Sequence, residues 1–330
     1  MALTAHRTAP AATAPVRAAA RGRPVLLALR GLGLGDLLTA VPALRALRRA
    51  HPGHRFVLAA PARLAGLLPL IGGVDELLDV SGPGPVPWRG PDVAVNLHGS
   101  GPQSTLALCR TRPGRLLTHA HPGIPGVAGP PWREEMHEVR RWCAQLAWYG
   151  IPADPGDLAL RDPGRSPLRG GEIVIHPGAA SGARRWPPER FAEVAAELGR
   201  LGHPIVVTGG TAEIGIARRV ARLAGLPDGC VLAGRTGLPE LAALIAHARL
   251  VICGDTGVAH LATAYATPSV VLFGPVSPDR WGPPPGGPHI ALWAGIPGDP
   301  HADRPSDGLL RIGVPEVLAA ARRLLEVSPR

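Results

Sequence analysis

Short, continuous apolar runs recur along the chain, each followed by a polar or glycine-rich loop and then by a segment with helical spacing. Apolar runs of this length, bounded by turn residues, are typical of strands buried on both faces of a parallel sheet. The runs that we interpret as strands are residues 25–29, 55–60, 76–80 and 92–99 in the first half of the chain and residues 172–176, 204–210, 230–234, 250–254 and 269–274 in the second.

Helical spacing follows most of these runs. Residues 36–50 show it clearly, because Leu37, Val41 and Leu44 recur at three- and four-residue steps and mark one apolar face. Strands that alternate with helices predict parallel sheets covered by helices on both faces. The other predicted helices are residues 134–149, 187–201, 212–225, 238–248, 256–266 and 315–327.

The alternation runs twice, which predicts two α/β domains. Residues 152–171 are rich in proline, glycine and charged residues, a composition typical of a linker. We therefore expect one doubly wound, Rossmann-like domain with a parallel sheet at residues 24–151 and a second at residues 172–330, facing each other across a cleft. Residues 1–23, rich in alanine, proline, threonine and arginine, are expected to form a disordered tail. Ligands of such sheets bind at the carboxyl ends of the strands.

The loop after the first strand, GLGLGD at residues 31–36, is the first candidate site. Glycines such as Gly33 and Gly35 permit close approach to the backbone, and Asp36 places a carboxylate at the start of a helix. Two interpretations of Asp36 stay open: a helix cap and a proton acceptor at the cleft. The loop is one residue short of the dinucleotide fingerprint, and the second strand ends without an acidic residue. Binding of NAD or FAD is therefore disfavoured.

Two loops at strand ends in the second half carry unusual polar residues. HPGAASGARRW at residues 176–186 combines small residues with Arg184 and Arg185, whose guanidinium groups suit phosphate. GGTAE at residues 209–213 puts Glu213 at the start of a helix. Taken alone, Arg184 is equally well explained as a solvated surface charge.

The stretch GDTGVAH at residues 254–260 is the third such loop. If a helix begins near Thr256, its free N–H groups and positive dipole end favour an anion. Gly257 then leaves room for a bulky phosphate, and His260 lies one turn later on the same face. Taken singly, Asp255 and Thr256 are ordinary caps and His260 an ordinary packed histidine. Because all three loops follow strands of one sheet, together they predict a seat for a diphosphate group.

Composition limits the class of protein and its partners. The net charge is +10, and every positively charged side chain is arginine, which fits either a coding bias or attraction to phosphates and acidic membrane surfaces. Nucleic acid is disfavoured, because aromatic residues make up only 4% of the chain. No apolar run approaches the roughly 20 residues that cross a bilayer. The start lacks the apolar core of a secretory signal, so we expect a cytoplasmic protein, with a transit peptide as the alternative.

No metal site and no cofactor are predicted. The four cysteines are far apart and form no C-x-x-C pair, which indicates neither a zinc site nor a disulfide framework. His119 and His121 would need a third metal ligand that the sequence does not supply, so we assign them to a surface loop.

Four stretches resemble motifs of a known family. RGLGLGDLLTAVPALRALRRAHP at residues 30–52 resembles the amino-terminal motif of glycosyltransferase family 9, the heptosyltransferases of lipopolysaccharide core synthesis. DVAVNLHG at residues 92–99 is similar to an internal strand of that family. Residues 176–198 and 250–275 resemble the two carboxy-terminal motifs of the family. The resemblance spans most of residues 24–282, in the order of the family.

The resemblance implies a GT-B architecture, with the acceptor on the amino-terminal domain and the nucleotide sugar on the carboxy-terminal domain. It also implies inverting, metal-independent transfer from a nucleotide diphosphate sugar, typically ADP-heptose. Asp36 corresponds to the candidate base of the family, and Arg184 to a phosphate-contacting position where lysine is usual. The other donor-binding positions implied are Glu213, Asp255, Thr256, Gly257 and His260.

We therefore expect a glycosyltransferase that moves a heptose-like sugar from a nucleotide diphosphate sugar, with an ADP-sugar favoured, to a hydroxyl of a glycan, glycolipid or small-molecule acceptor. Two alternatives stay open: a nucleotide-sugar epimerase or hydrolase, which needs no acceptor, and a noncatalytic nucleotide-sugar-binding protein, which does not need the carboxylate of Asp36. An oxidoreductase is the least favoured of the functions considered. The basic surface leaves open a peripheral position at the inner face of the membrane.

Overall fold

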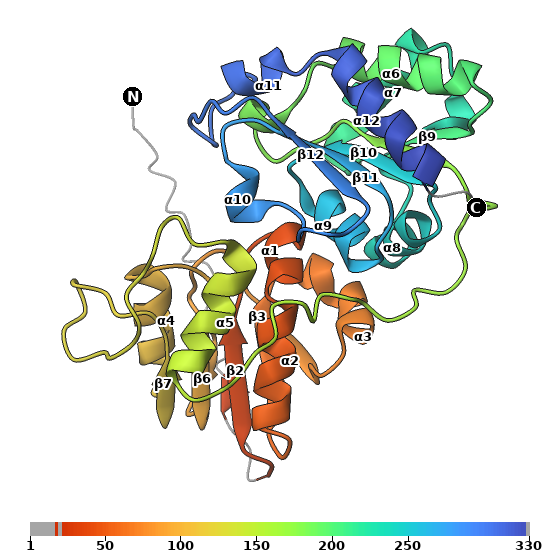
Figure 1. Ribbon diagram of the computed structural model, residues 1–330. Helices are drawn as coiled ribbons and strands as arrows, with labels where there is room; N and C mark the ends of the chain where they lie inside the picture. Colours follow the sequence, from red (N-terminus) through yellow and green to blue (C-terminus); the bar gives the residue numbers. More distant parts are fainter. Residues whose placement is uncertain (1–16, 19–21, 328–330) are drawn as a thin grey trace, which may run out of the picture.

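Two five-stranded parallel sheets form the core of the structure, a computed structural model that describes residues 17–18 and 22–327 (Figure 1). The first sheet has the order β4-β3-β2-β6-β7 and the second the order β12-β11-β10-β8-β9. The first comprises β2 (Val25–Leu29), β3 (Arg55–Ala60), β4 (Glu76–Asp79), β6 (Val93–Asn96) and β7 (Arg115–Leu117). The second comprises β8 (Ile173–His176), β9 (Ile205–Val207), β10 (Leu250–Gly254), β11 (Ser269–Phe273) and β12 (His289–Trp293).

The central strands of both sheets are apolar along their whole length because both faces are covered. All five residues of β2 and all five of β10 are buried. Leu26 of β2 lies opposite Phe56 of β3 and Val93 of β6, which fixes the register of the first sheet. This confirms the prediction of doubly wound sheets with helices on both faces.

The helices of the first half differ from the prediction, because residues 62–71 and 103–110 form helical elements that were not predicted and the first long helix is divided. Residues 36–50 were expected to form one helix, but the chain forms α1 (Leu34–Thr39) and then α2 (Val41–Ala50). Pro42 is the second residue of α2 and has no N–H to donate to the preceding turn, so the ladder of hydrogen bonds breaks there. The remaining helices are η1 (Ala62–Leu67), α3 (Leu68–Ile71), α4 (Gln103–Arg110) and α5 (Glu138–Trp148).

In the second half, the strand predicted at residues 230–234 is wrong in extent. Cys230 ends a 3₁₀ turn, and only an isolated bridge joins Val231 to Val207. The strand β12 and the short helices near it were not predicted. The helical elements are η2 (Gly182–Arg184), α6 (Pro188–Arg200), η3 (Thr211–Glu213), α7 (Ile214–Leu223), η4 (Asp228–Cys230), α8 (Leu238–Ala246), α9 (Gly257–Ala264), α10 (Pro278–Trp281), α11 (Asp307–Arg311) and α12 (Val314–Val327).

Residues 152–171 connect the two sheets without forming a helix or strand of their own. This segment is bound to both halves, because the N–H of Arg161 donates to Leu70 and the N–H of Leu160 donates to Ala264 of α9. Two residues of the predicted tail form β1 (Arg17–Ala18), which pairs with β5 (Trp88–Arg89). Residues 1–16 and 19–21 lie outside the described residues, so the tail and the domain boundaries stay predictions.

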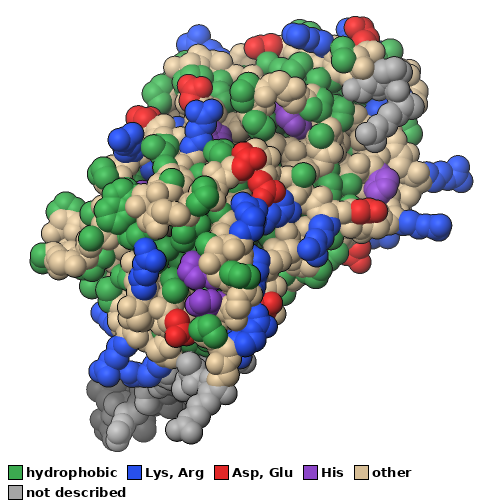
Figure 2. Space-filling view, turned by 60° about the horizontal axis from the view of Figure 1, so that its bottom comes forward, with side chains coloured by type: hydrophobic (Ala, Val, Ile, Leu, Met, Phe, Trp, Pro, Cys, Tyr) green, Lys and Arg blue, Asp and Glu red, His purple; other side chains and the backbone are tan. Residues whose placement is uncertain are grey.

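Arginine side chains are spread over the surface. Figure 2 shows them at many separate places on one face, mixed with acidic and apolar side chains. Several are neutralised locally, as where Arg45 and Arg49 both pair with Asp157. Within the described part of the chain, no helix combines the length and the apolar character needed to cross a membrane.

The two halves touch where α1 packs directly on α9 (Figure 1). A Cβ atom added at Gly257 would lie 2.7 Å from Cβ of Leu34, and one added at Gly35 would lie 2.8 Å from Cδ2 of His260. Both separations are shorter than carbon atoms tolerate, so the two glycines permit this contact. Beside it, Nε2 of His137 lies 3.0 Å from the carbonyl oxygen of Gly282.

Replacing Gly257 by alanine is expected to destabilise the protein by about 1–3 kcal/mol, because the added methyl group overpacks the contact with Leu34. Chemical denaturation measures the change. Gly215 offers a matched control, since it also lies in the first turn of a helix and a Cβ there meets nothing within 4 Å. Gly215→Ala should be neutral or slightly stabilising. Equal effects of the two substitutions would contradict the packing argument.

Candidate active site

The candidate loops lie at the points where each sheet reverses its strand order. In the first sheet the chain builds outward from β2 to β3 and β4 and then returns to β6 on the other side. In the second sheet the same reversal falls between β8 and β10. Doubly wound sheets bind ligands in the crevice at the carboxyl ends of these strands. The loops that carry Asp36, Arg184 and Asp255 follow β2, β8 and β10, and are therefore at the expected position.

Asp36 caps its own helix and keeps part of its side chain exposed. Its Oδ2 accepts a hydrogen bond of 3.1 Å from the N–H of Gly33, so it caps the start of α1. Its Oδ1 lies 3.5 Å from Nη2 of Arg30. The Asp36 side chain keeps 27% of its surface exposed, which leaves the carboxylate accessible from the cleft.

The start of α9 carries a half-buried cap beside a buried carboxylate. Thr256 is the N-cap, and its Oγ1 accepts from the N–H of Val258 at 3.3 Å. Asp255 is buried, and its Oδ2 lies 3.4 Å from Nη1 of Arg184 without a hydrogen bond. Burial raises the pKa of Asp255, and Asp36 across the cleft adds to the effect, whereas Arg184 opposes it. The two motifs are thus close enough to interact electrostatically.

The two remaining loop residues are engaged with their own loops. Arg185 donates through Nε and Nη2 to the carbonyl oxygen of Ala179, at 3.0 and 2.8 Å, so one edge of its guanidinium group is bound to its own loop. Glu213 accepts from the N–H of Gly210 at 2.7 Å and caps its own turn. Its carboxylate also lies 3.9 Å from Nε2 of His176, the last residue of β8.

His260 faces α1 as well as the start of its own helix. Its ring lies against Gly35 and 6.1 Å from the ring of Trp281. Burial, followed by the charge of His137, lowers the pKa of His260 to about 4. The imidazole is therefore neutral at pH 7, so it can hydrogen-bond a ligand but adds no positive charge.

The position of Gly257 requires a change of interpretation. The sequence suggested that a glycine there leaves room for phosphate, but the space beside its Cα is taken by Leu34 of the opposite half. The packing of α1 on α9 alone explains the small residue.

A cavity of about 850 Å³ opens between the two halves on the far side of His260. Its walls come from α5, from the connecting residues 155–158, from α9 and from residues 278–285. Leu38 and His260 line it, whereas Asp36 and Arg184 do not. The cavity therefore adjoins the candidate site without including its charged groups.

The low pKa of His260 predicts a pH effect on stability. In the unfolded chain the residue titrates near 6.5, whereas in the folded protein it titrates near 4. Between these values only the unfolded chain binds the proton, so the free energy of unfolding falls as the pH drops. His260→Gln should lose less stability than the wild type between pH 7 and pH 5, by about 2 kcal/mol.

Urea denaturation at both pH values measures this difference. His301→Gln, at an exposed histidine, is the control and should follow the wild type. Parallel pH dependence in the wild type and His260→Gln would show that the His260 imidazole is not desolvated as described.

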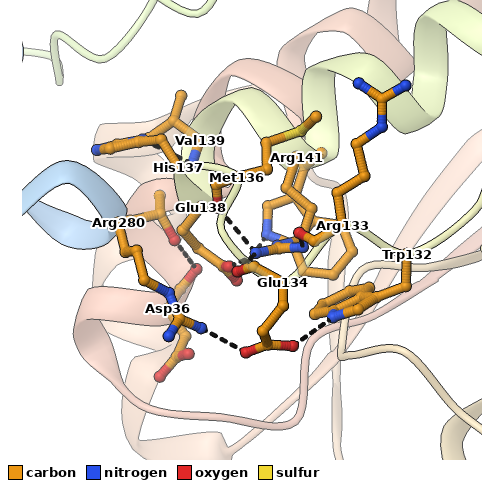
Figure 3. A network of polar contacts seen from close by, with 12 residues as sticks. Asp36, Trp132, Arg133, Glu134, Met136, His137, Glu138, Val139, Arg141 and Arg280 are labelled. Carbon is orange, nitrogen blue, oxygen red and sulfur yellow. Dashed lines mark hydrogen bonds and ion pairs between the residues drawn. The ribbon is translucent and has the colours of Figure 1, made fainter. Parts of the chain in front are cut away.

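Two residues of the site were not singled out from the sequence: Arg30 and Glu138. Arg30 is completely buried behind Asp36, and Glu138, at the start of α5, accepts from its Nη2 at 2.9 Å. Figure 3 shows Glu138 in a network that extends through Arg141 and Glu134 to Arg280 of α10. The sequence feature that could have indicated Arg30 is its position, because a charged residue directly follows the apolar run of β2.

Two Rossmann-like domains that face each other with their switch points define the GT-B class of fold. The glycosyltransferase family 9 protein of Veillonella parvula shares it, with a TM-score of 0.73 at 22% identity over 92% of this chain and 98% of that one. The ADP-heptose lipopolysaccharide heptosyltransferase II of Escherichia coli does so too, with a TM-score of 0.73 at 21% identity over 92% and 99%.

Sequence comparison indicates the family. Residues 138–301 match the family model described as glycosyltransferase family 9 (heptosyltransferase). Lipopolysaccharide heptosyltransferase 3 of Escherichia coli is 34% identical over 162 residues, which are 47% of each chain, so the match spans about half the length of this relative. Over these residues the chain is similar to the heptosyltransferases of glycosyltransferase family 9, and its fold is that of the two solved structures. The loop with Asp36 lies outside the matched residues.

Proposed function

We propose that the protein is a glycosyltransferase that moves a heptose-like sugar from a nucleotide diphosphate sugar, with ADP-heptose favoured, to a hydroxyl of a glycan, glycolipid or small-molecule acceptor. The names of its relatives favour this donor. We also propose that transfer inverts the anomeric centre and that the protein works in the cytoplasm. A peripheral position at the inner face of the membrane stays a prediction.

One observation carries the proposal: the carboxylate of Asp36 and the Arg184–Asp255–Thr256 group approach each other across the contact of α1 with α9. Each belongs to a different sheet and lies at its switch point. Asp36 raises the pKa of Asp255, which supports their proximity. A donor held by its diphosphate at α9 would therefore present its sugar toward Asp36.

In the proposed reaction, Asp36 acts on the acceptor, and Arg184 and α9 act on the leaving group. Asp36 accepts the proton of the acceptor hydroxyl, whose oxygen forms a bond to the anomeric carbon from the face opposite the diphosphate. The bond from the anomeric carbon to the diphosphate oxygen breaks, and the nucleoside diphosphate leaves with the electron pair. Arg184 and the N-terminal end of α9 stabilise the negative charge that grows on the leaving group.

Metal independence is part of the proposal. Among the described residues, no group of three or more His, Cys, Asp or Glu side chains is placed to hold a metal ion. Transfer that survives treatment with EDTA would support this part of the proposal, and loss of transfer that added Mg²⁺ or iron restores would contradict it.

The first test is a thermal-shift panel of nucleoside diphosphates and their sugars, followed by a product assay with the sugar that binds. A ligand that binds only the folded protein raises its melting temperature. We expect a rise with ADP and ADP-sugars, and release of ADP only when an acceptor is present. Release without acceptor indicates a hydrolase, and a changed sugar without release indicates an epimerase. No response to any nucleotide would contradict the proposal.

A further inference from the structure

Arg30 is a fully buried charge at the end of β2. Burying an arginine is costly unless its N–H groups are bonded and its charge is balanced. All three of its nitrogens are engaged. Nε donates to the carbonyl oxygen of Asp36 at 2.9 Å, and Nη1 donates to that of Leu97 at 2.5 Å. Nη2 contacts Thr39 and Glu138 at 3.2 and 2.9 Å.

The same guanidinium group fixes Asp36 at two points. It bonds the main chain of Asp36 through Nε and lies 3.5 Å from its Oδ1 through Nη2. The N–H of Gly33 holds the other carboxylate oxygen. Both oxygens of Asp36 are thus oriented by groups of the same domain, while part of the side chain stays exposed to the cleft.

Glu138 balances the charge of Arg30. Its Oε1 accepts from Arg30 and from Nε1 of Trp142, at 2.9 and 3.0 Å, and its Oε2 accepts from Nε of Arg141 at 3.1 Å. Burial alone would raise the pKa of Glu138, but the charges of Arg30 and Arg141 lower it below its ordinary value. Glu138 is therefore an ionised, fully bonded anchor, and its oxygens are not free to accept a proton from a substrate.

The ring of Trp142 completes the seat of Arg30. The guanidinium carbon lies 4.8 Å from the centre of the ring, within the range of a cation–π contact. A lysine at this position would carry the charge but not the planar fork, so it could satisfy only some of these partners.

We propose that Arg30, anchored by Glu138, is a positioning residue that holds the carboxylate of Asp36 in its reactive orientation. The inference rests on the proposed function, in which Asp36 accepts the proton of the acceptor. Arg30 acts through Asp36 and does not itself reach the cleft, because none of its surface is exposed.

The test uses the double variant Arg30→Met/Glu138→Gln, which removes both charges of this pair together. Arg141 loses its carboxylate partner but keeps its hydrogen bonds to the carbonyl oxygens of Glu134 and Met136. We expect kcat to fall about 100-fold, as a misplacement of about 1 Å can cause, with the Kd of ADP unchanged within about threefold. The single variant Arg30→Lys should have a kcat between those of the double variant and the wild type. A merely structural role would instead lower the melting temperature and leave kcat of the folded fraction unchanged.

Arg45→Met/Asp157→Asn is the matched control, since it removes another ion pair, between α2 and the connecting segment, in which Arg45 also bonds the carbonyl oxygens of Ile71 and Ala159. We expect it to keep kcat within about threefold of the wild type. Equal kcat in the two double variants would overturn the inference.

If the wild type transfers no sugar, the proposed function is wrong, but the positioning role of Arg30 can still be tested. Crystal structures of the wild type and of Arg30→Met/Glu138→Gln provide this test. We expect the Asp36 carboxylate to move by more than about 0.5 Å in the double variant, the tolerance within which reactive groups must be held. An unmoved carboxylate would overturn the positioning role.

Discussion

Asp36→Asn is expected to bind the donor nucleotide as the wild type does and to transfer sugar at least about 100-fold more slowly, the lower range for losing a general base. Asparagine has the same shape, and its amide oxygen can still accept from the N–H of Gly33, so the cap of α1 survives. What disappears is the capacity to take a proton from the acceptor. Steady-state kinetics together with calorimetric titration of ADP measures both quantities.

The control for this substitution is Asp79→Asn. Asp79 also accepts a backbone hydrogen bond, from the N–H of Ala62, but it lies at the far edge of the same sheet. We expect transfer by this variant to match the wild type. If Asp36→Asn kept more than about a third of the wild-type rate, its carboxylate would be only a helix cap.

Arg184→Ala is expected to weaken ADP binding about 10- to 100-fold, because a hydrogen bond to a charged group contributes about 1.5–3 kcal/mol. The substitution also leaves Asp255 buried without its partner, and this lowers stability. Arg184→Ala/Asp255→Asn removes that second effect, so its affinity for ADP reports the lost contact with phosphate. Titration calorimetry with ADP, and with adenosine as a ligand without phosphate, measures the difference.

Arg190 provides the matched control, because it lies a few residues further along and donates to the carbonyl oxygens of Leu310 and Ile312, away from the cleft. Arg190→Ala should change the Kd of ADP less than about threefold. Equal affinity of Arg184→Ala and the wild type for ADP would remove Arg184 from the diphosphate seat.

The fold class could be predicted because buried parallel strands leave a local signal. The runs at residues 25–29, 55–60 and 250–254 coincide with β2, β3 and β10. The missed strands β7 and β12 lie at sheet edges, where partly exposed residues interrupt the apolar run. The helix at residues 36–50 was overextended, because periodicity continues across Pro42 while the hydrogen bonds do not.

The site could be predicted only where its residues lie in one local motif. Asp36 and the Asp255–Thr256 pair each follow a buried strand, and this pattern is visible in the sequence. The roles of Arg30 and Glu138 depend on a contact across 108 positions of the chain. The fit of Gly257 against Leu34 depends on how the two halves dock. Neither of these two contacts produces a pattern within a single segment of the sequence.

If one half of the protein rotates on the other about the contact of α1 with α9, the displacement of each residue depends on its distance from that contact. Points close to a pivot move little, and distant points move in proportion to their distance from it. Asp36 and Thr256 sit beside the contact, whereas β7 and β9 form outer edges of the two sheets. A rotation about this contact would move the outer edges of both sheets more than it moves Asp36 and Thr256.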